Sequence, residues 1–217
     1  MTRGRFITFE GGEGGGKSTQ IQYLVKALQE VGIDVVSTRE PGGTLAAEEI
    51  RQLLVAGSPN RWLPKTELLL HCSARVEHVE GVIEPALGSG RWVLSDRFHD
   101  STTAYQGYGL ELGLELVDTL HGLLHGDFRP DLTLILDLPV ELGLQRTKRR
   151  KEADDRYEQM DITFHERLRF GFLDIARKEP SRCVVVDASK DEDVVFKQVI
   201  DAVNNRLALA LDRQHNF

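Results

Sequence analysis

Cysteine is scarce in this sequence, which excludes a fold held together by a disulfide framework. Cys72 and Cys183 lie far apart and form neither a C-x-x-C pair nor the spacing of metal ligands. Thiols of this kind are typical of a reducing compartment, where they pack as small apolar groups. We therefore expect two buried, unpaired thiols.

Long apolar runs and a surplus of basic residues are absent as well. No segment approaches the roughly 20 apolar residues that a membrane span requires, and the N-terminus enters residues 6–9 without the apolar stretch of a signal peptide. The chain has 27 basic and 34 acidic residues, a net charge of −7, so no chain-wide basic field exists to hold a nucleic acid. We expect a cytoplasmic protein that binds neither membranes nor nucleic acid.

The sequence does contain enough apolar material for one compact domain, since 41% of its 217 residues are hydrophobic. Short apolar runs rich in β-branched residues predict five buried strands, at about residues 5–9, 33–37, 92–95, 132–138 and 183–187. Helical spacing of apolar residues predicts a first helix through Ile21, Leu24, Val25, Leu28 and Val31. It predicts a longer helix from Leu68 to Leu87 and a last helix at about 191–212. Strands alternating with helices predict a three-layer α/β fold around a parallel sheet.

The strongest motif directly follows the first predicted strand. Residues 11–18 read Gly-Gly-Glu-Gly-Gly-Gly-Lys-Ser, which matches G-x-x-x-x-G-K-[ST] and opens a predicted helix. Glycines let backbone N–H groups turn toward a phosphate, Lys17 can bridge the β- and γ-phosphates, and the Ser18 hydroxyl can ligate Mg²⁺. A flexible glycine-rich turn is the alternative, but the Lys-Ser pair between a strand and a helix favours nucleotide binding.

A second acidic and basic pair ends the third predicted strand. Asp96 and Arg97 stand side by side at the carboxyl edge of the sheet, where ligands bind in open α/β folds. There the aspartate can hold the water shell of a metal and the arginine can bind a phosphate, although a surface ion pair is the plainer alternative. The guanine-binding N-K-x-D and the D-x-x-G switch of a GTPase do not occur in the sequence, which argues against a GTPase.

A basic run on a predicted helix comprises Arg146, Lys148, Arg149, Arg150 and Lys151, and Arg156 follows the acidic stretch 152–155. By itself such a run is typical of a solvated helix end. Because the phosphate-binding loop contains no arginine, a mobile lid that neutralises a transferring phosphoryl group becomes the favoured interpretation.

Further motifs resemble those of the bacterial thymidylate kinases in order and spacing, over most of the chain. Besides Phe-Glu-Gly-Gly-Glu-Gly-Gly-Gly-Lys-Ser at 9–18, they are Thr-Arg-Glu-Pro-Gly-Gly-Thr at 38–44, Glu-Glu-Ile-Arg at 48–51, Ser-Ala-Arg at 73–75, Asp-Arg-Phe at 96–98 and Ala-Tyr-Gln-Gly at 104–107. The resemblance implies a P-loop NTPase fold of the nucleoside-monophosphate-kinase type, in one domain over residues 1–217 with a short lid at about 146–158. It also implies that ATP phosphorylates dTMP to dTDP with Mg²⁺ as cofactor, and that the protein is a homodimer.

The same resemblance assigns roles to individual residues. ATP would be bound by Gly11, Gly12, Glu13, Gly14, Gly15, Gly16, Lys17, Ser18 and Thr19. The acceptor nucleotide would be bound by Glu13, Arg39, Glu40, Arg51, His71, Arg75, Arg97, Thr102, Tyr105 and Gln106. Ser18 and Asp96 would hold the metal, and the catalytic residues would be Lys17, Asp96, Arg97 and the lid candidates Arg149, Arg150 and Arg156.

Within the acceptor site, the resemblance implies that Glu13 accepts a hydrogen bond from the 3′-hydroxyl of dTMP and that Arg97 binds the 5′-phosphate. Arg75 would reach the thymine carbonyl edge, Thr102 and Gln106 would add polar contacts to the base, and Tyr105 would crowd the 2′ position. This crowding favours a deoxyribose acceptor.

The chain departs from the family pattern at two positions. His71 stands where members commonly have a phenylalanine that stacks on the base, and Leu110 replaces an arginine. If His71 has an ordinary pKa near 6.5, its ring becomes protonated as the pH falls through that value. Protonation would then raise the KM for dTMP. Two alternatives remain at this point: a kinase for another small nucleotide or nucleoside acceptor, and a P-loop nucleotide-binding module with little turnover.

Overall fold

The computed structural model describes residues 3–149 and 156–212 and contains a five-stranded sheet. Its strands are β1 (Phe6–Glu10), β2 (Val35–Arg39), β3 (Trp92–Asp96), β4 (Leu132–Asp137) and β5 (Cys183–Asp187), in the order β2-β3-β1-β4-β5. All neighbouring strands are parallel. The predicted five-stranded parallel sheet is therefore confirmed, with each strand within about two residues of its expected position.

Burial of the strands differs between the centre and the edges of the sheet. Every residue of β1 is buried, as are the first five of β4, because helices cover both faces of the central strands. The edge strand β2 has no fully buried residue, and in β5 only Cys183 and Val186 are buried. The expectation that all five strands are buried is wrong for these two edges, where cover is incomplete.

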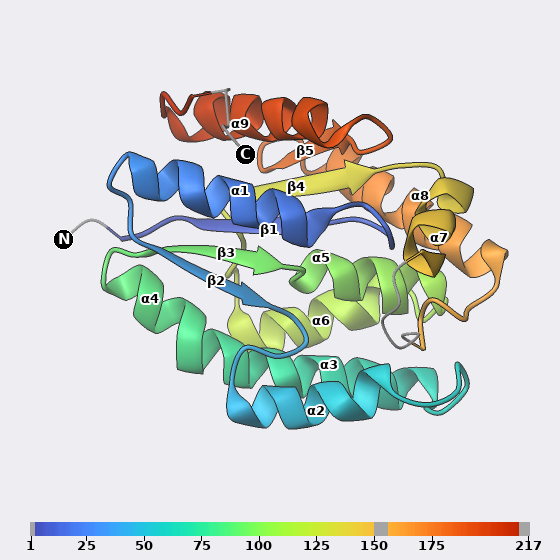
Figure 1. Ribbon diagram of the computed structural model, residues 1–217. Helices are drawn as coiled ribbons and strands as arrows, with labels where there is room; N and C mark the ends of the chain where they lie inside the picture. The colour runs from blue at the N-terminus through green and yellow to red at the C-terminus, as the bar shows by residue number, and fades with distance from the viewer. Residues whose placement is uncertain (1–2, 150–155, 213–217) are drawn as a thin grey trace.

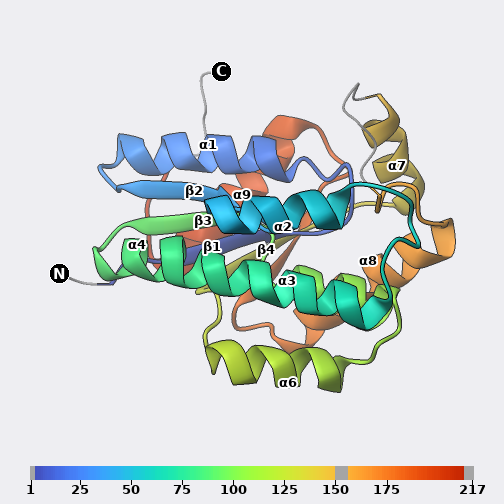
Figure 2. The same cartoon turned by 90° about the horizontal axis from the view of Figure 1, so that it is seen from below.

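Helices pack on both faces of the sheet and complete the three layers. Helices α1 (Lys17–Glu30) and α9 (Glu192–Leu207) contact one another and the sheet on one face. Figure 2 shows α1 on one side of the strands, with α3 (Pro64–His78) and α6 (Leu114–His125) on the other. That second side also holds α4 (Glu84–Gly88) against β3 and α8 (Ile162–Lys178) against β4 and β5.

The remaining elements gather toward the carboxyl ends of the strands. Helix α2 (Leu45–Val55) packs along α3, while α5 (His99–Thr102) follows β3 and continues into the π-helical turn η2 (Thr103–Gly109). Helix α7 (Val140–Lys148) packs against α8, beyond the end of β4 (Figure 1). The sheet thus directs several chain segments to one edge.

Some helix boundaries differ from the sequence prediction. Val31 lies just beyond α1 and is 53% exposed, because the chain turns there toward β2. The long helix expected from 68 to 87 is divided into α3, a π-helical turn η1 (Val79–Ile83) and α4. The last helix ends at Leu207, since Ala208 adopts a left-handed backbone with φ of 54°.

Both cysteines are buried and unpaired, as the sequence predicts. Over the described parts of the chain, no helix combines the length and apolar character needed to cross a membrane.

Candidate active site

A cavity of about 640 Å³ opens at the carboxyl ends of β1, β2 and β3, a volume suited to a small-molecule ligand. Most of the predicted site residues line it: Glu13, Gly14, Gly15, Gly16, Lys17, Ser18, Arg39, Glu40, Arg51, His71, Arg75, Asp96, Arg97, Thr102, Tyr105 and Gln106. Gly11, Gly12, Thr19, Arg149 and Arg156 do not line it, and Arg150 lies outside the described residues.

The loop between β1 and α1 has a backbone that requires glycine. Gly11 and Gly14 have φ of 125° and 70°, and a Cβ at these positions would lie 2.4 Å from the Leu136 carbonyl oxygen and 2.3 Å from the Gly143 carbonyl oxygen. Lys17 folds back across this loop, where its Nζ donates to the Gly12 carbonyl at 2.9 Å. Burial and the neighbouring Arg97 guanidinium lower the pKa of Lys17.

Ser18 and Asp96 meet at the start of α1 and the end of β3. The Ser18 Oγ donates to the Asp96 Oδ2 at 2.8 Å. Hydroxyl and carboxylate oxygens are ligands that Mg²⁺ accepts, so this pair fits the predicted metal site. Among the described residues, no three His, Cys, Asp or Glu side chains are arranged around a common metal position. A magnesium ion held here would therefore take further oxygens from water and nucleotide phosphates.

Arg97 links the end of β3 to the glycine loop. Its backbone is left-handed, with φ of 72°, which is uncommon for a non-glycine residue and marks a constrained position. Its Nη1 donates to the Gly11 carbonyl at 2.9 Å and its Nη2 to the Glu13 Oε1 at 3.0 Å. The guanidinium also lies over the Tyr105 ring, 4.9 Å from its centroid. A cation is thereby fixed beside the loop.

Glu13 is the anionic partner in this arrangement. Its Oε1 accepts hydrogen bonds from Arg97 and from the Tyr105 hydroxyl. Burial opposes ionisation of the carboxyl, but the positive charges of Arg97 and Lys17 hold its pKa at about 2. Glu13 is therefore a carboxylate that can accept a hydrogen bond from a ligand hydroxyl.

Arg75 is held by a second, deeply buried ion pair. Its Nε donates to the Glu40 Oε2 at 2.8 Å, and its Nη2 donates to the Thr102 Oγ1 at 2.8 Å. The other Glu40 oxygen lies 2.9 Å from the His78 Nδ1. Burial would raise the pKa of Glu40, but Arg75 and His78 keep it lowered. These contacts fix the Arg75 guanidinium in the cavity wall.

Arg39, at the end of β2, and Arg51, in α2, border the same cavity on either side of the segment that joins these elements. Arg39 Nη2 donates to both Glu48 carboxylate oxygens, at 3.0 and 2.9 Å, and Arg51 Nη1 donates to the Pro41 carbonyl at 2.8 Å. A cis peptide bond joins Glu40 to Pro41 within this segment. The predicted site residues from β2 and α2 therefore reach the cavity together.

Arg156 does not lie where an arginine of a lid over the transferring phosphoryl group would lie. It is 1% exposed, and its guanidinium donates to the carbonyls of Leu54 and Pro59, at 2.9 and 2.7 Å, and to the carboxylate of Glu67. All of these partners hold it behind the cavity wall, away from the glycine loop. Arg149 is exposed at the end of α7. Of the three lid candidates, Arg156 thus has a position typical of a structural ion pair.

Glu67 is the centre of a network that the sequence analysis missed. Besides Arg156, it accepts hydrogen bonds from the Gln106 Nε2 at 2.8 Å and from the Tyr157 hydroxyl at 2.9 Å. A signal was present, since Glu67, His71 and Arg75 are four residues apart and share one face of α3. Tyr157, which also lines the cavity, has no comparable signal in the sequence.

His71 is held by this network. Its Nε2 lies 2.9 Å from the Tyr157 hydroxyl oxygen. Burial and the positive charge of Arg75 lower the pKa of His71 to about 3. The expectation that His71 titrates near 6.5 is therefore wrong, because three further arginines also surround the imidazole.

Comparisons with known proteins agree with this geometry. A family model described as "Thymidylate kinase" matches residues 9–199. A thymidylate kinase from Caulobacter vibrioides is 54% identical over 209 residues, covering 96% of this chain and all of the relative. One from Dinoroseobacter shibae is 50% identical over 197 residues, covering 91% of this chain and 95% of the relative. The crystal structure of a thymidylate kinase from Ehrlichia chaffeensis has a TM-score of 0.75 at 38% identity, covering 93% of this chain and 99% of that chain.

Proposed function

The chain belongs to the thymidylate kinase family, and we propose that it transfers the γ-phosphate of ATP to dTMP, giving ADP and dTDP. The observation that carries this proposal is a single cavity that extends from the glycine loop, past Arg97 and Tyr105 beside it, to Arg75. A donor and an acceptor nucleotide can thus meet between Lys17 and Arg97. A low-turnover nucleotide-binding module would have no need of the second half of this cavity.

Phosphoryl transfer requires a protein to align two nucleotides and to stabilise negative charge. We assign the ATP phosphates to the backbone N–H groups of the glycine loop and to Lys17, and the acceptor phosphate to Arg97. Ser18 and Asp96 would hold Mg²⁺, which neutralises charge on the phosphates when bound. The protein would be a single domain with a lid at about 146–158, and Arg149 or Arg150 of this lid would add positive charge beside the transferred phosphoryl group.

The acceptor site is suited to a deoxyribonucleotide. Tyr105 is held by its hydrogen bond to Glu13 and by the Arg97 guanidinium over its ring, so its position beside the acceptor sugar would leave little room for a 2′-hydroxyl. Arg75, fixed by Glu40 and Thr102, would meet the base. These residues favour dTMP over AMP or CMP.

The test is ADP release across a panel of nucleoside monophosphates. We expect the highest kcat/KM with dTMP and strong discrimination against its ribose analogue. Tyr105→Ala should narrow that ribose discrimination, whereas Tyr23→Ala, at a half-buried position of α1 that does not line the cavity, serves as the matched control. Equal use of AMP or CMP would contradict the assignment.

We also propose a homodimer that works in the cytoplasm. Exposed leucines, namely Leu69 on α3 and Leu123 and Leu124 on α6, lie on two helices that contact one another and would be covered in a dimer. The two free thiols suit a reducing compartment. Sedimentation velocity tests the dimer, which Leu123→Glu should weaken.

A further inference from the structure

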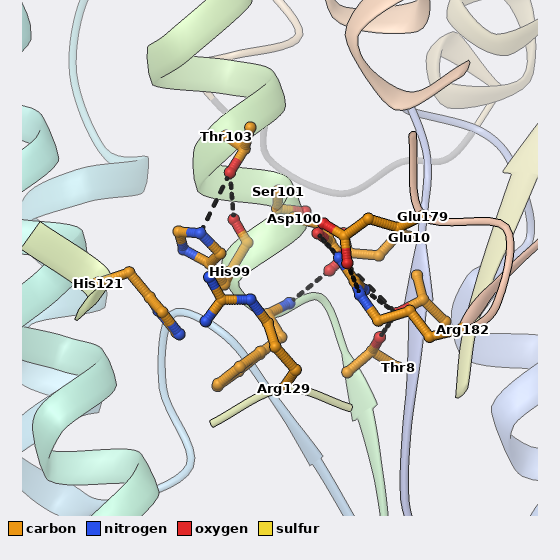
Figure 3. A network of polar contacts seen from close by, with 12 residues as sticks. Thr8, Glu10, His99, Asp100, Ser101, Thr103, His121, Arg129, Glu179 and Arg182 are labelled. Carbon is orange, nitrogen blue, oxygen red and sulfur yellow. Dashed lines mark hydrogen bonds and ion pairs between the residues drawn. The ribbon is translucent and has the colours of Figure 1, made fainter. Parts of the chain in front are cut away.

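Glu10 is a wholly buried carboxyl group at the last position of β1, immediately before the glycine loop. Its Oε1 accepts a hydrogen bond from the Phe98 backbone N–H at 2.8 Å, and its Oε2 lies 2.5 Å from the Ser101 Oγ. Figure 3 shows Glu10 in a cluster with Asp100, Ser101 and Arg182. The roles assigned above make no use of this carboxyl group.

Both partners of Glu10 flank Arg97. Phe98 is the next residue in the chain, and the Ser101 Oγ accepts a hydrogen bond from the Arg97 Nη1 at 3.1 Å. The Arg97 backbone has a left-handed φ of 72°, and its N–H donates to the Phe9 carbonyl, next to Glu10, at 2.9 Å. A left-handed arginine persists only where its surroundings fix it. The Glu10 carboxyl group supplies two of those fixing contacts.

We infer that Glu10 is a positioning residue for Arg97, acting through the Phe98 backbone and the Ser101 hydroxyl while touching neither nucleotide. The inference rests on the proposed function and deepens it, since Arg97 is assigned to the acceptor phosphate. Loss of Glu10 should therefore weaken dTMP binding more than ATP binding.

Charged and titratable groups face Glu10 from several elements. Burial and the nearby Asp100 carboxylate raise the pKa of Glu10 to about 8, against the opposing effects of Ser101 and Arg97. Asp100 is itself paired with Arg182, at 2.6 and 2.8 Å. Lys17 faces Glu10 from α1, and Cys183 from β5. Around neutral pH, Glu10 is thus mostly protonated; the Ser101 hydroxyl donates to the carboxylate form of Glu10, whereas the protonated form can donate its own proton to the Ser101 Oγ.

Binding of a phosphate dianion at Arg97 would favour this protonated form, because a second negative charge opposes ionisation of Glu10. By linkage, the KM for dTMP should rise as the pH increases through about 8. Glutamine reproduces the neutral form, since its oxygen can accept from Phe98 and its amide can donate to Ser101. Glu10→Gln should therefore remove this rise.

The experiment measures KM for each nucleotide between pH 7 and 9 in the full-length enzyme. For Glu10→Ala we expect the KM for dTMP to rise about tenfold and the KM for ATP to change less than about twofold, because the lost contacts are with Phe98 and Ser101, which position Arg97. Glu10→Gln should keep the KM for dTMP within about threefold of wild type at pH 7 and show a flat profile to pH 9.

Ser101→Ala and Val203→Ala guard against a purely structural effect. Ser101→Ala removes the link to Arg97 but keeps the bond from Phe98, and it should raise the KM for dTMP about threefold. Val203→Ala, in the core contact of α9, should lower stability without changing either KM. Turnover of dTMP by wild type tests the proposed function separately. With that turnover present, equal KM changes for both nucleotides, or equal pH profiles in wild type and Glu10→Gln, would overturn the role of Glu10.

Discussion

The two ends of the cavity are built from different parts of the chain. At the phosphate end, a continuous glycine loop positions Lys17 through its own carbonyl groups. At the base end, side chains from η2 and from the segment after residue 155 converge on Glu67 of α3. The first end depends on local backbone geometry, whereas the second depends on buried ion pairs between distant segments. Substitutions should therefore affect chemistry at the first and stability at the second.

The largest expected effect concerns the phosphate end. The loop itself offers Lys17 and backbone N–H groups to the charge on a transferring phosphoryl group, so a further cation from the predicted lid is needed. We expect Arg149→Ala or Arg150→Ala to lower kcat by up to about 10³-fold with little change in KM.

Single-substitution kinetics at saturating ATP and dTMP tests this, with Lys151→Ala as the control that should have little effect. Arg150 and Lys151 lie outside the described residues. If both arginine variants keep kcat within about threefold of wild type, the proposed lid mechanism is wrong.

The next largest effect is on stability and concerns Arg156, which belongs to the base end of the cavity. Removing one partner of a buried ion pair leaves an uncompensated charge and costs about 3–5 kcal/mol. Arg156→Met should accordingly lower the free energy of unfolding by about this amount, because Glu67 would lose its charged partner. Urea titration measures the loss.

Two further variants sharpen the comparison. Arg91→Met, at an exposed position before β3, should change stability by less than about 0.5 kcal/mol. The double substitution of Arg156 and Glu67 by methionine should recover part of the stability lost in Arg156→Met. A large loss of kcat in Arg156→Met with unchanged stability would instead place Arg156 at the phosphoryl group.

The same contrast explains what the sequence could predict. The glycine loop, Asp96 and Arg97 follow strand ends, so periodicity and a contiguous motif were enough to bring them together at one edge of the sheet. The buried position of Arg156 could not be predicted, because its partners Leu54, Pro59 and Glu67 are about 90 to 100 residues away in the chain. The local sequence of a basic run does not distinguish an arginine in solvent from an arginine buried in an ion pair.

The burial of edge strands and the boundaries of helices were also predicted incompletely from the sequence. The central strands were predicted because their apolar runs are buried on both faces, whereas β2, which has two valines followed by three polar residues, lies at an edge with incomplete cover. The π-helical turn η1 interrupts a periodic apolar pattern, and a local signal is present there: Gly81 lies within η1, and Pro85 lacks the N–H that would bond to the Gly81 carbonyl. Tertiary packing decided the exposure of β2, and packing is not encoded in a short window of sequence.

The smallest expected effect concerns His71 at the base end. Because burial and Arg75 lower its pKa to about 3, the imidazole stays neutral between about pH 5.5 and 8, the range in which an ordinary histidine titrates. Any effect of pH on the KM for dTMP in this range should therefore be the same, within about twofold, in wild type and His71→Phe.

Stability provides the complementary readout for His71. The unfolded chain binds a proton at His71 below about pH 6.5, whereas the folded chain does not until the pH approaches about 3. This difference makes the folded state less stable as the pH falls from about 6.5 toward 3, and His71→Phe should reduce that loss. Urea titrations of both enzymes at about pH 7 and pH 5 measure the difference. A KM for dTMP that changes near pH 6.5 only in wild type would show that His71 is more exposed to solvent than its contacts with Tyr157 and the surrounding arginines indicate.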